Sequence, residues 1–234
     1  AYLKSNGTVW SVGSNQYGQL GDGTTTNRPN PVQVMDSAGT PISNVAAISS
    51  GECQIVFLKS DGTVRSVGRN NRGQLGDGTI VDRSNPVQAV DLLGNPISNV
   101  IKISAGFEHL LIMKADGTVW ACGGNDSGQL GDGSTSNRSN PVQVLDSGGT
   151  PIANVVSIAA GATHSVLLKR DGRVWATGYN AHGQLGDGST LSKNSPVQVT
   201  DSLGNPISDI SSISAGSNHT VFLDVNAKTW STGR

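Results

Sequence analysis

The chain repeats itself with a period of 55 residues. The string Gly-Gln-Leu-Gly-Asp-Gly begins at residues 18, 73, 128 and 183, so each copy starts 55 residues after the one before it. Tryptophan recurs at the same spacing, at positions 10, 120, 175 and 230, and Arg65 takes the remaining place. Tandem repeats of this length form similar units that bury their faces against their neighbours. A recurring residue is therefore explained first by the repeat, and a site is sought where the copies differ.

Each repeat has the pattern of four short strands. In the clearest copy, apolar and β-branched runs predict strands at 154–159, 164–169, 174–177 and 196–199. Asp171-Gly172 lies between the second and third runs, and Asp-Gly in that place is a strong hairpin signal. No window shows apolar residues at helical spacing over three turns. Four antiparallel strands per repeat are typical of a β-propeller blade, whereas a solenoid of β-coils would need shorter repeats.

The two ends of the chain fall inside the repeat, because residues 1–14 align with residues 221–234. We expect one all-β propeller segment over residues 1–234, a partial ring of about four to five blades. The expected units, the first and last of them partial, are about 1–44, 45–99, 100–154, 155–209 and 210–234. Three alternatives would accommodate the incomplete end units. A strand at 31–34 could complete the last blade and close a four-bladed ring, or the chain could be a piece of a longer protein. In the third alternative, partial rings associate through their unpaired strand edges.

Composition narrows the function classes. The formal net charge of -1 gives no global attraction to nucleic acid or to an acidic membrane surface. No apolar run approaches the roughly 20 residues of a membrane span. Charged residues make up 14% of the chain, against about a quarter in an average protein. A neutral surface rich in hydroxyl groups is closer to that of a secreted bacterial protein, so we expect an extracellular or cell-surface setting.

A longer motif underlies the repeat. The pattern Ile-Ser/Ala-Ala-Gly-x-x-His, then Leu-Lys-x-Asp-Gly-x-Val-Trp-x-x-Gly-x-Asn-x-x-Gly-Gln-Leu-Gly-Asp-Gly, resembles the repeat of the RCC1 family (regulator of chromosome condensation) over the whole chain. The resemblance implies a β-propeller, typically of seven blades, which would need about 385 residues at this repeat length. The family includes an exchange factor for Ran, plant ultraviolet receptors, a bacterial inhibitor of β-lactamases and many bacterial surface proteins. The Asp-x-x-Gly-x-Pro-Ile connectors are most similar to the surface proteins.

The recurring polar residues are assigned to structure. The glycine-rich string is not expected to cradle phosphate, because no helix follows it and no Lys-Ser/Thr completes the motif. One carboxylate per loop makes a poor calcium site, so the aspartates are expected to accept backbone N–H bonds. The histidines recur one blade apart, too far for metal bonds of roughly 2 Å, and should bond neighbouring backbone. No metal or cofactor is therefore predicted. The recurring aspartates and histidines assigned to structure are Asp22, Asp77, Asp132, Asp187, His109, His164 and His219.

Two further residue types are assigned to packing. The four tryptophans share one strand position, so they are expected to pack between blades, with each indole N–H finding a local acceptor. Cys53 lies in a predicted turn and Cys122 in a predicted strand, at different places in the repeat. Both are expected to be free thiols, one partly exposed and one buried.

Candidate partner-binding residues occur where the copies differ, in loops at strand ends. They have the chemistry of interface anchors, with neutral drift in solvated loops as the alternative, and they are Tyr17, Arg69, Arg72, Phe107, Glu108, Tyr179 and His182. No serine lies in a Gly-x-Ser-x-Gly elbow and no carboxylate pair is unique to one copy, so no enzyme is predicted.

Three functions are weighed on this basis. The expected function is a non-enzymatic structural or protein-interaction module of a larger bacterial, extracellular protein. Its partner would be another protein or further repeats of the same chain, and it would bind no nucleic acid and enter no membrane. The alternative is a dedicated inhibitor or regulator that binds its partner through one loop face. A lectin-like sugar binder or an enzyme is the least favoured.

Overall fold

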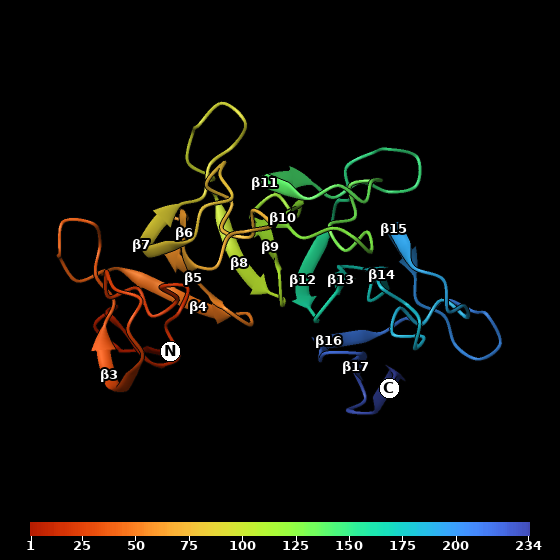
Figure 1. Cartoon of the computed structure of the whole chain (residues 1–234). Helices are drawn as coiled ribbons and strands as arrows, with labels where there is room; N and C mark the ends of the chain where they lie inside the picture. The colour runs from red at the N-terminus through yellow and green to blue at the C-terminus, as the bar shows by residue number, and fades with distance from the viewer.

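The computed structural model describes all 234 residues, and it consists of strands, turns and loops. Five antiparallel sheets follow one another in chain order. They lie side by side in an open arc, with the two termini in the sheets at its opposite ends (Figure 1). The prediction of an all-β partial propeller with four to five blades is confirmed.

The three central sheets have four strands each, hydrogen-bonded in chain order. The second sheet consists of β4 (Val45–Ser50), β5 (Gln54–Lys59), β6 (Val64–Gly68) and β7 (Arg83–Gln88). The third consists of β8 (Val100–Ala105), β9 (His109–Lys114), β10 (Val119–Gly123) and β11 (Arg138–Gln143). The fourth consists of β12 (Val155–Ala160), β13 (His164–Lys169), β14 (Val174–Gly178) and β15 (Lys193–Gln198).

The two terminal sheets have three strands each. The first consists of β1 (Tyr2–Leu3), β2 (Val9–Gly13) and β3 (Arg28–Gln33). The fifth consists of β16 (Ile210–Ala215), β17 (His219–Asp224) and β18 (Thr229–Gly233). Strand β3 pairs with β2, where Gln33 lies opposite Trp10, and β18 pairs with β17 alone. The alternative in which the strand at 31–34, most of which belongs to β3, completes the last blade and closes a four-bladed ring is therefore wrong.

Tight hairpins join the second and third strands of the last four sheets, and β1 to β2 in the first sheet. In the hairpin between β5 and β6, Gly62 has a φ of 78° and donates its N–H to the carbonyl of Lys59. The Asp61 carboxylate accepts both the backbone N–H and the hydroxyl of Thr63, at 2.9 and 2.6 Å. Glycine adopts positive φ without steric cost, and aspartate favours turns by bonding the backbone two residues on. The Asp-Gly signal therefore marks a real turn.

The hydrophobic core lies between successive sheets rather than within one of them. Val56 and Val64 of the second sheet share a cluster with Ile103 and Leu110 of the third, and corresponding clusters fill the other three junctions. Because a central strand packs against a sheet on either side, β9 is buried over its first five residues. Full burial of one large apolar side chain is worth about 1.5–3 kcal/mol. Neighbouring sheets must stack for that energy to be gained.

A buried asparagine organises each of the four loops that follow β2, β6, β10 and β14. The side-chain Nδ2 of Asn125 donates to the Asp132 carboxylate and to the carbonyls of Ser134 and Ser136, each at 3.1 Å. Asp132 also accepts the N–H of Ser134 at 3.0 Å and lies 2.7 Å from the guanidinium of Arg138. Burial of Asp132 acts in the opposite direction, but the hydrogen bonds from Ser134 and Arg138 hold the pKa of its carboxyl below the usual value. The predicted backbone bonds are confirmed, and the ion pair adds to them.

The same loop clamps the outer strand of the next sheet. Gly133 donates its N–H to the carbonyl of Asn194 at 2.9 Å, and its own carbonyl accepts a bond from the Asn194 side chain at 2.9 Å. A Cβ on Gly128 would lie 2.5 Å from the Cα of Asn194, so the two backbones are in direct contact. The glycines of the repeated string thus serve the contact between sheets.

His109 and His164 link neighbouring sheets. The His109 Nε2 lies 3.1 Å from the hydroxyl of Ser165, which donates to the carbonyl of Gln129 at 2.6 Å. Since that hydroxyl proton is already directed at a carbonyl, His109 Nε2 carries the hydrogen and donates it. Its Nδ1 is buried without a partner. The same arrangement joins His164, Thr220 and Gln184. His109 and His164 are structural as predicted, but they bond hydroxyls of the next sheet rather than backbone, whereas His219 is exposed on the last sheet.

Trp120 and Trp175 pack between sheets as predicted, Trp120 against the cluster between the second and third sheets and Trp175 against that between the third and fourth. Trp230, on the last sheet, is 50% exposed. The indole N–H groups of Trp10, Trp120 and Trp175 have no acceptor, so that part of the prediction is wrong. A lysine ammonium instead lies over each ring, 4.6 Å from the ring centroid in the pair Lys114–Trp120. The other pairs at this repeat position are Lys4–Trp10 and Lys169–Trp175.

The repeat without a tryptophan provides a test of this contact. Lys59 bonds the carbonyl of Ser43 instead, and burial together with the charge of Arg65 lowers the pKa of Lys59. We expect Arg65→Trp to raise the free energy of unfolding by about 0.5–1 kcal/mol, because it replaces a repulsion with a cation–π contact. Urea denaturation measures the gain. Arg65→Leu is the control, since it removes only the repulsion, and equal stability of the two variants would contradict the expectation.

Neither cysteine forms a disulfide. Cys122 is buried in β10, and burial raises the pKa of its thiol. Cys53 is half-buried in the turn between β4 and β5, where burial also raises its pKa. One packed thiol and one partly exposed thiol are as predicted.

Candidate partner-binding face

The loops that vary between copies lie together at one end of the sheets, which we call the loop end. Because neighbouring strands are antiparallel, the turn after β4 and the loop after β6 meet at the same end of the second sheet. The corresponding turns and loops of the other sheets share that end. All seven candidate residues are carried by these turns and loops.

Four of the candidates form a connected group across the first three sheets. The guanidinium of Arg69 lies over the ring of Tyr17, 5.2 Å from its centroid, and 3.3 Å from the Glu108 carboxylate. Arg72 lies 3.8 Å from the same carboxylate and 3.2 Å from Asp126. All these side chains are at least partly exposed, and exposed ion pairs contribute only about 0–1 kcal/mol to stability. The group therefore adds little to the fold and leaves charge and aromatic surface available at the loop end.

Tyr179 and His182 form a separate aromatic pair on the fourth sheet. Their ring centroids are 6.0 Å apart and the ring planes meet at 77°. Tyr179 also lines a cavity of about 430 Å³ between the third and fourth sheets, with Asp126, Ser127, Thr135, Ser192 and Asn194. Asp126 thus belongs both to the connected group and to this cavity. It was not among the predicted residues, although its position is one of those that vary between copies.

Phe107 stands apart from the connected group. Its side chain is 43% exposed, and it lines a cavity of about 260 Å³ where the innermost strands of four sheets end. Apart from Glu52, the other lining residues are Gly, Ala and Ser from the ends of these strands and the turns that follow them. The Phe107 N–H donates to the carbonyl of Ala162 at 3.3 Å, which holds two neighbouring turns together. Of the seven candidates, Phe107 alone lies at the inner edge of the loop end.

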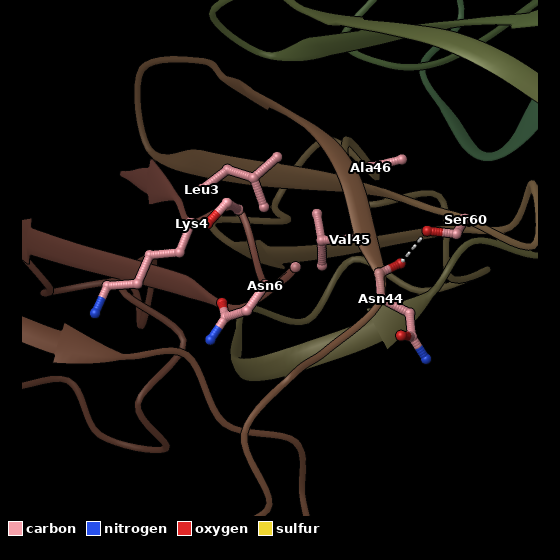
Figure 2. Close-up of a pocket in the computed structure, with 9 residues that line it drawn as sticks. Leu3, Lys4, Asn6, Asn44, Val45, Ala46 and Ser60 are labelled. Atoms are coloured by element: carbon pink, nitrogen blue, oxygen red, sulfur yellow. Dashed lines mark hydrogen bonds between the residues drawn. The ribbon is translucent and has the colours of Figure 1, made fainter.

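A larger cavity of about 520 Å³ lies at the opposite end, between β1 and β4 (Figure 2). Leu3, Lys4, Val45 and Ala46 are among its lining residues, and Ser60 donates to the carbonyl of Asn44 beside it. The equivalent position between the third and fourth sheets holds a cavity of only about 190 Å³, and Ile101 of β8 is among its lining residues. The first sheet has no strand in the place of β8, so the larger cavity is an unfilled version of a repeated gap.

The chain shows no group of three or more His, Cys, Asp or Glu side chains arranged to hold a metal ion. It likewise has no helix long and apolar enough to cross a membrane. The chemistry available at the loop end is that of recognition: guanidinium groups, carboxylates and aromatic rings presented on rigid strand ends.

Comparisons with known proteins agree with the fold. The family model of the RCC1-like domain matches residues 1–234. The ultraviolet-B receptor UVR8 of Arabidopsis thaliana is 31% identical over 233 residues, which cover 100% of this chain and 50% of the receptor. The human probable E3 ubiquitin-protein ligase HERC3 is 35% identical over 199 residues, which cover 84% of this chain and 18% of the ligase. The chain therefore spans half or less of the length of these relatives.

Solved structures give the same result. Human WBSCR16 superposes with a TM-score of 0.80 at 26% identity, covering 99% of this chain and 58% of that protein. Prp20p of Saccharomyces cerevisiae, whose structure was described together with its binding to Gsp1p and histones, superposes with a TM-score of 0.66 at 20% identity. The latter likeness covers 99% of this chain and 68% of Prp20p, and it concerns the fold alone. By its repeat, its five-sheet arc and the match along its whole length, the chain belongs to the RCC1-like domain family.

Proposed function

We propose that this chain is a non-enzymatic protein-interaction module that binds a protein partner through its loop end. The observation that carries the proposal is the connected group of Tyr17, Arg69, Arg72 and Glu108, which breaks the repeat where three sheets meet. Tyrosine and arginine are enriched among the residues that dominate protein–protein binding energy. The known binding of Prp20p to other proteins supports the proposal by analogy of fold.

The role of the loop end in partner binding is tested by comparing substitutions there with one at the opposite end of the sheets. We expect Arg69→Ala combined with Phe107→Ala to weaken partner binding at least tenfold, since truncation of one anchor residue often costs about 2 kcal/mol or more. The control is Arg170→Ala, in an exposed hairpin turn at the opposite end. The partner is captured from the native source with the full chain, and its affinity for each variant is measured by calorimetry. A partner that tolerates the loop-end substitutions and is lost with Arg170→Ala would contradict the proposal.

A dedicated inhibitor or regulator is the second candidate, favoured by the rigid, varied loops on a single face. It differs from a scaffold in what happens to the partner: an inhibitor or exchange factor changes the partner's activity on binding, and a scaffold does not. An activity assay of the captured partner with and without saturating chain separates the two.

A larger bacterial, extracellular protein is proposed as the setting of the module. The proposal is supported by the low share of charged residues, 14%, and by a surface rich in hydroxyl side chains. The two relatives described above come from a plant and from human. Detection of the natural product in the medium or on the cell surface tests the setting, and its recovery only inside cells would overturn it.

A further inference from the structure

We propose that the cavity beside Tyr179 is a binding site for an arginine side chain of a protein partner. The inference rests on the proposed function and specifies what the partner presents to the loop end.

The first three sheets contain a complete internal example, in which Arg69 of the second sheet lies between Tyr17 of the first and Glu108 of the third. There the guanidinium of Arg69 lies 5.2 Å from the centroid of the Tyr17 ring and 3.3 Å from the Glu108 carboxylate. An arginine is thus held between an aromatic ring and a carboxylate, both from neighbouring sheets. Arginine suits this geometry because its flat guanidinium stacks on aromatic rings while its N–H groups bond carboxylate oxygens.

The junction between the third and fourth sheets contains an aromatic ring and a carboxylate without an arginine between them. Tyr179 occupies the repeat position of Arg69, and Ser127 occupies that of Tyr17. The aromatic ring therefore stands on the other side of the junction, opposite a small side chain. The cavity of about 430 Å³ opens between them, and Asp126 supplies a carboxylate at its edge. A ring and a carboxylate are present, and the guanidinium that joins them in the first junction has no counterpart here.

The charge of the cavity favours a cation. Its six lining residues include one carboxylate and no lysine, arginine or histidine; the other five are Ser127, Thr135, Tyr179, Ser192 and Asn194. The Asp126 side chain is 65% exposed, and its one ion-pair partner, Arg72, belongs to the connected group. A carboxylate offers about four lone-pair sites, so Asp126 can accept from a second guanidinium while it keeps Arg72. The serine and threonine hydroxyls can accept the remaining N–H groups.

Tyr179 contacts His182 and Thr163, neither of which lines the cavity. His182 meets the tyrosine ring edge to face, with a centroid distance of 6.0 Å, and the Tyr179 backbone N–H donates to the carbonyl of Thr163 at 2.9 Å. An edge contact leaves at least one face of the tyrosine ring free of the histidine. A ring fixed in this way loses little freedom when a cation stacks on it, which is what makes preorganised aromatic residues effective anchors.

The first experiment uses a defined probe on the full chain. The peptide acetyl-Gly-Gly-Arg-Gly-Gly-amide is titrated at low ionic strength and followed by NMR at the amides of residues 126, 127, 179, 192 and 194. We expect millimolar binding localised to these residues, since one exposed cation–π contact and one ion pair are weak alone. The same peptide with citrulline in place of arginine keeps the shape and loses the charge, and it should bind at least about tenfold more weakly.

Three variants define the site. Tyr179→Leu and Asp126→Asn should each weaken the arginyl peptide about three- to tenfold, because each removes one of the two attractions. The double variant Ser127→Tyr with Tyr179→Arg rebuilds the pair found in the first junction, so an internal arginine fills the site and peptide binding should be lost. Tyr2→Leu, an exposed tyrosine on the first sheet, is the control and should leave the affinity unchanged.

The outcomes separate this inference from the proposed function. Equal binding of the arginyl and citrullinyl peptides, or shifts away from these five residues, would overturn the arginine site. A natural partner that is lost with Arg69→Ala and Phe107→Ala but retained by Tyr179→Leu and Asp126→Asn would also overturn it, while the interaction function stands. Conversely, peptide binding as expected, with a partner that tolerates Arg69→Ala and Phe107→Ala but is weakened by Tyr179→Leu and Asp126→Asn, would support the site and show that the connected group does not carry the partner binding.

Discussion

Gly128→Ala will lower the free energy of unfolding by more than about 3 kcal/mol, well beyond the loss from the same change at Gly149. Both glycines have positive φ, 82° and 78°, so each variant carries the cost of about 1–2 kcal/mol for placing a side chain in that region. They differ in their surroundings. A Cβ on Gly128 would lie 2.5 Å from the Cα of Asn194 and 2.7 Å from the carbonyl oxygen of Lys193, whereas a Cβ on Gly149 meets nothing within 4 Å.

The clash at Gly128 is costly because the atoms in the way are backbone. Lys193 and Asn194 belong to β15 of the next sheet, whose position is fixed by its pairing with β14. Relief would require the third and fourth sheets to move apart, which would loosen the apolar cluster between them. Urea denaturation of both variants measures the difference, with circular dichroism to confirm that each retains its strands. Equal losses at the two positions would mean that the loop does not clamp the next sheet.

The comparison also explains why the glycine-rich string recurs so faithfully. The string lies where one sheet touches the next, so its geometry must be reproduced at every junction. In the described structure this holds for the loops after β2, β6 and β10, where the first glycine of each string would meet Ser84, Ser139 or Asn194. Sequence identity between the copies therefore reports packing between sheets and carries no information about a ligand.

The parts of the fold that depend on local signals could be predicted from the sequence. Asp61-Gly62 and its counterparts mark hairpins because the positive φ and the aspartate bond are properties of two or three adjacent residues. The contacts between sheets could not be predicted in the same way. Whether the His109 ring meets backbone or the Ser165 hydroxyl depends on the register of two sheets, and residues 56 apart in sequence carry no local signal of it.

The candidate site shows the same division. The end of the sheets that carries the varied loops follows from strand direction alone, and all seven candidates lie there. Which of them touch does not follow. Arg69 reaches Glu108 across the junction between the second and third sheets. Asp126 joins the group because Arg72 crosses the same junction. Phe107 is adjacent to Glu108 in sequence, yet it points to the inner edge instead. Contacts of this kind require the spacing between neighbouring sheets.

Lowering the pH will destabilise the protein over a pH range set by its two buried histidines, His109 and His164. Burial, with a smaller contribution from the charge of a neighbouring histidine, lowers the pKa of His109 to about 3 and that of His164 to about 4. In the unfolded chain both titrate near 6.5, so between pH 6.5 and pH 4 the unfolded state binds protons that the folded state does not. The free energy of unfolding therefore falls as the pH falls, by up to about 1.4 kcal/mol per pH unit for each histidine.

The carboxylates act in a lower window. Hydrogen bonds lower the pKa of Asp22, Asp77, Asp132 and Asp187 below 3.8 against the opposing effect of burial. Their contribution to stability is complete above that value and is lost only as the pH falls through their folded pKa values. A decline that begins near pH 6 is consequently assigned to the histidines, and a further decline below pH 4 includes the aspartates.

The histidine contribution is isolated by a substitution that the chain itself contains. His109→Gln places at that position the residue found at Gln54, which bonds the next sheet through its amide and does not titrate. We expect the slope of unfolding free energy against pH between 6 and 4.5 to fall by about half, whatever the variant's stability at pH 7. His182→Gln removes an exposed histidine and should leave the slope unchanged. Two results would contradict this expectation: a wild-type slope near zero, or a slope that His109→Gln leaves unchanged. Either would show that His109 takes up a proton in the folded state, and hence that the third and fourth sheets separate locally before the protein unfolds.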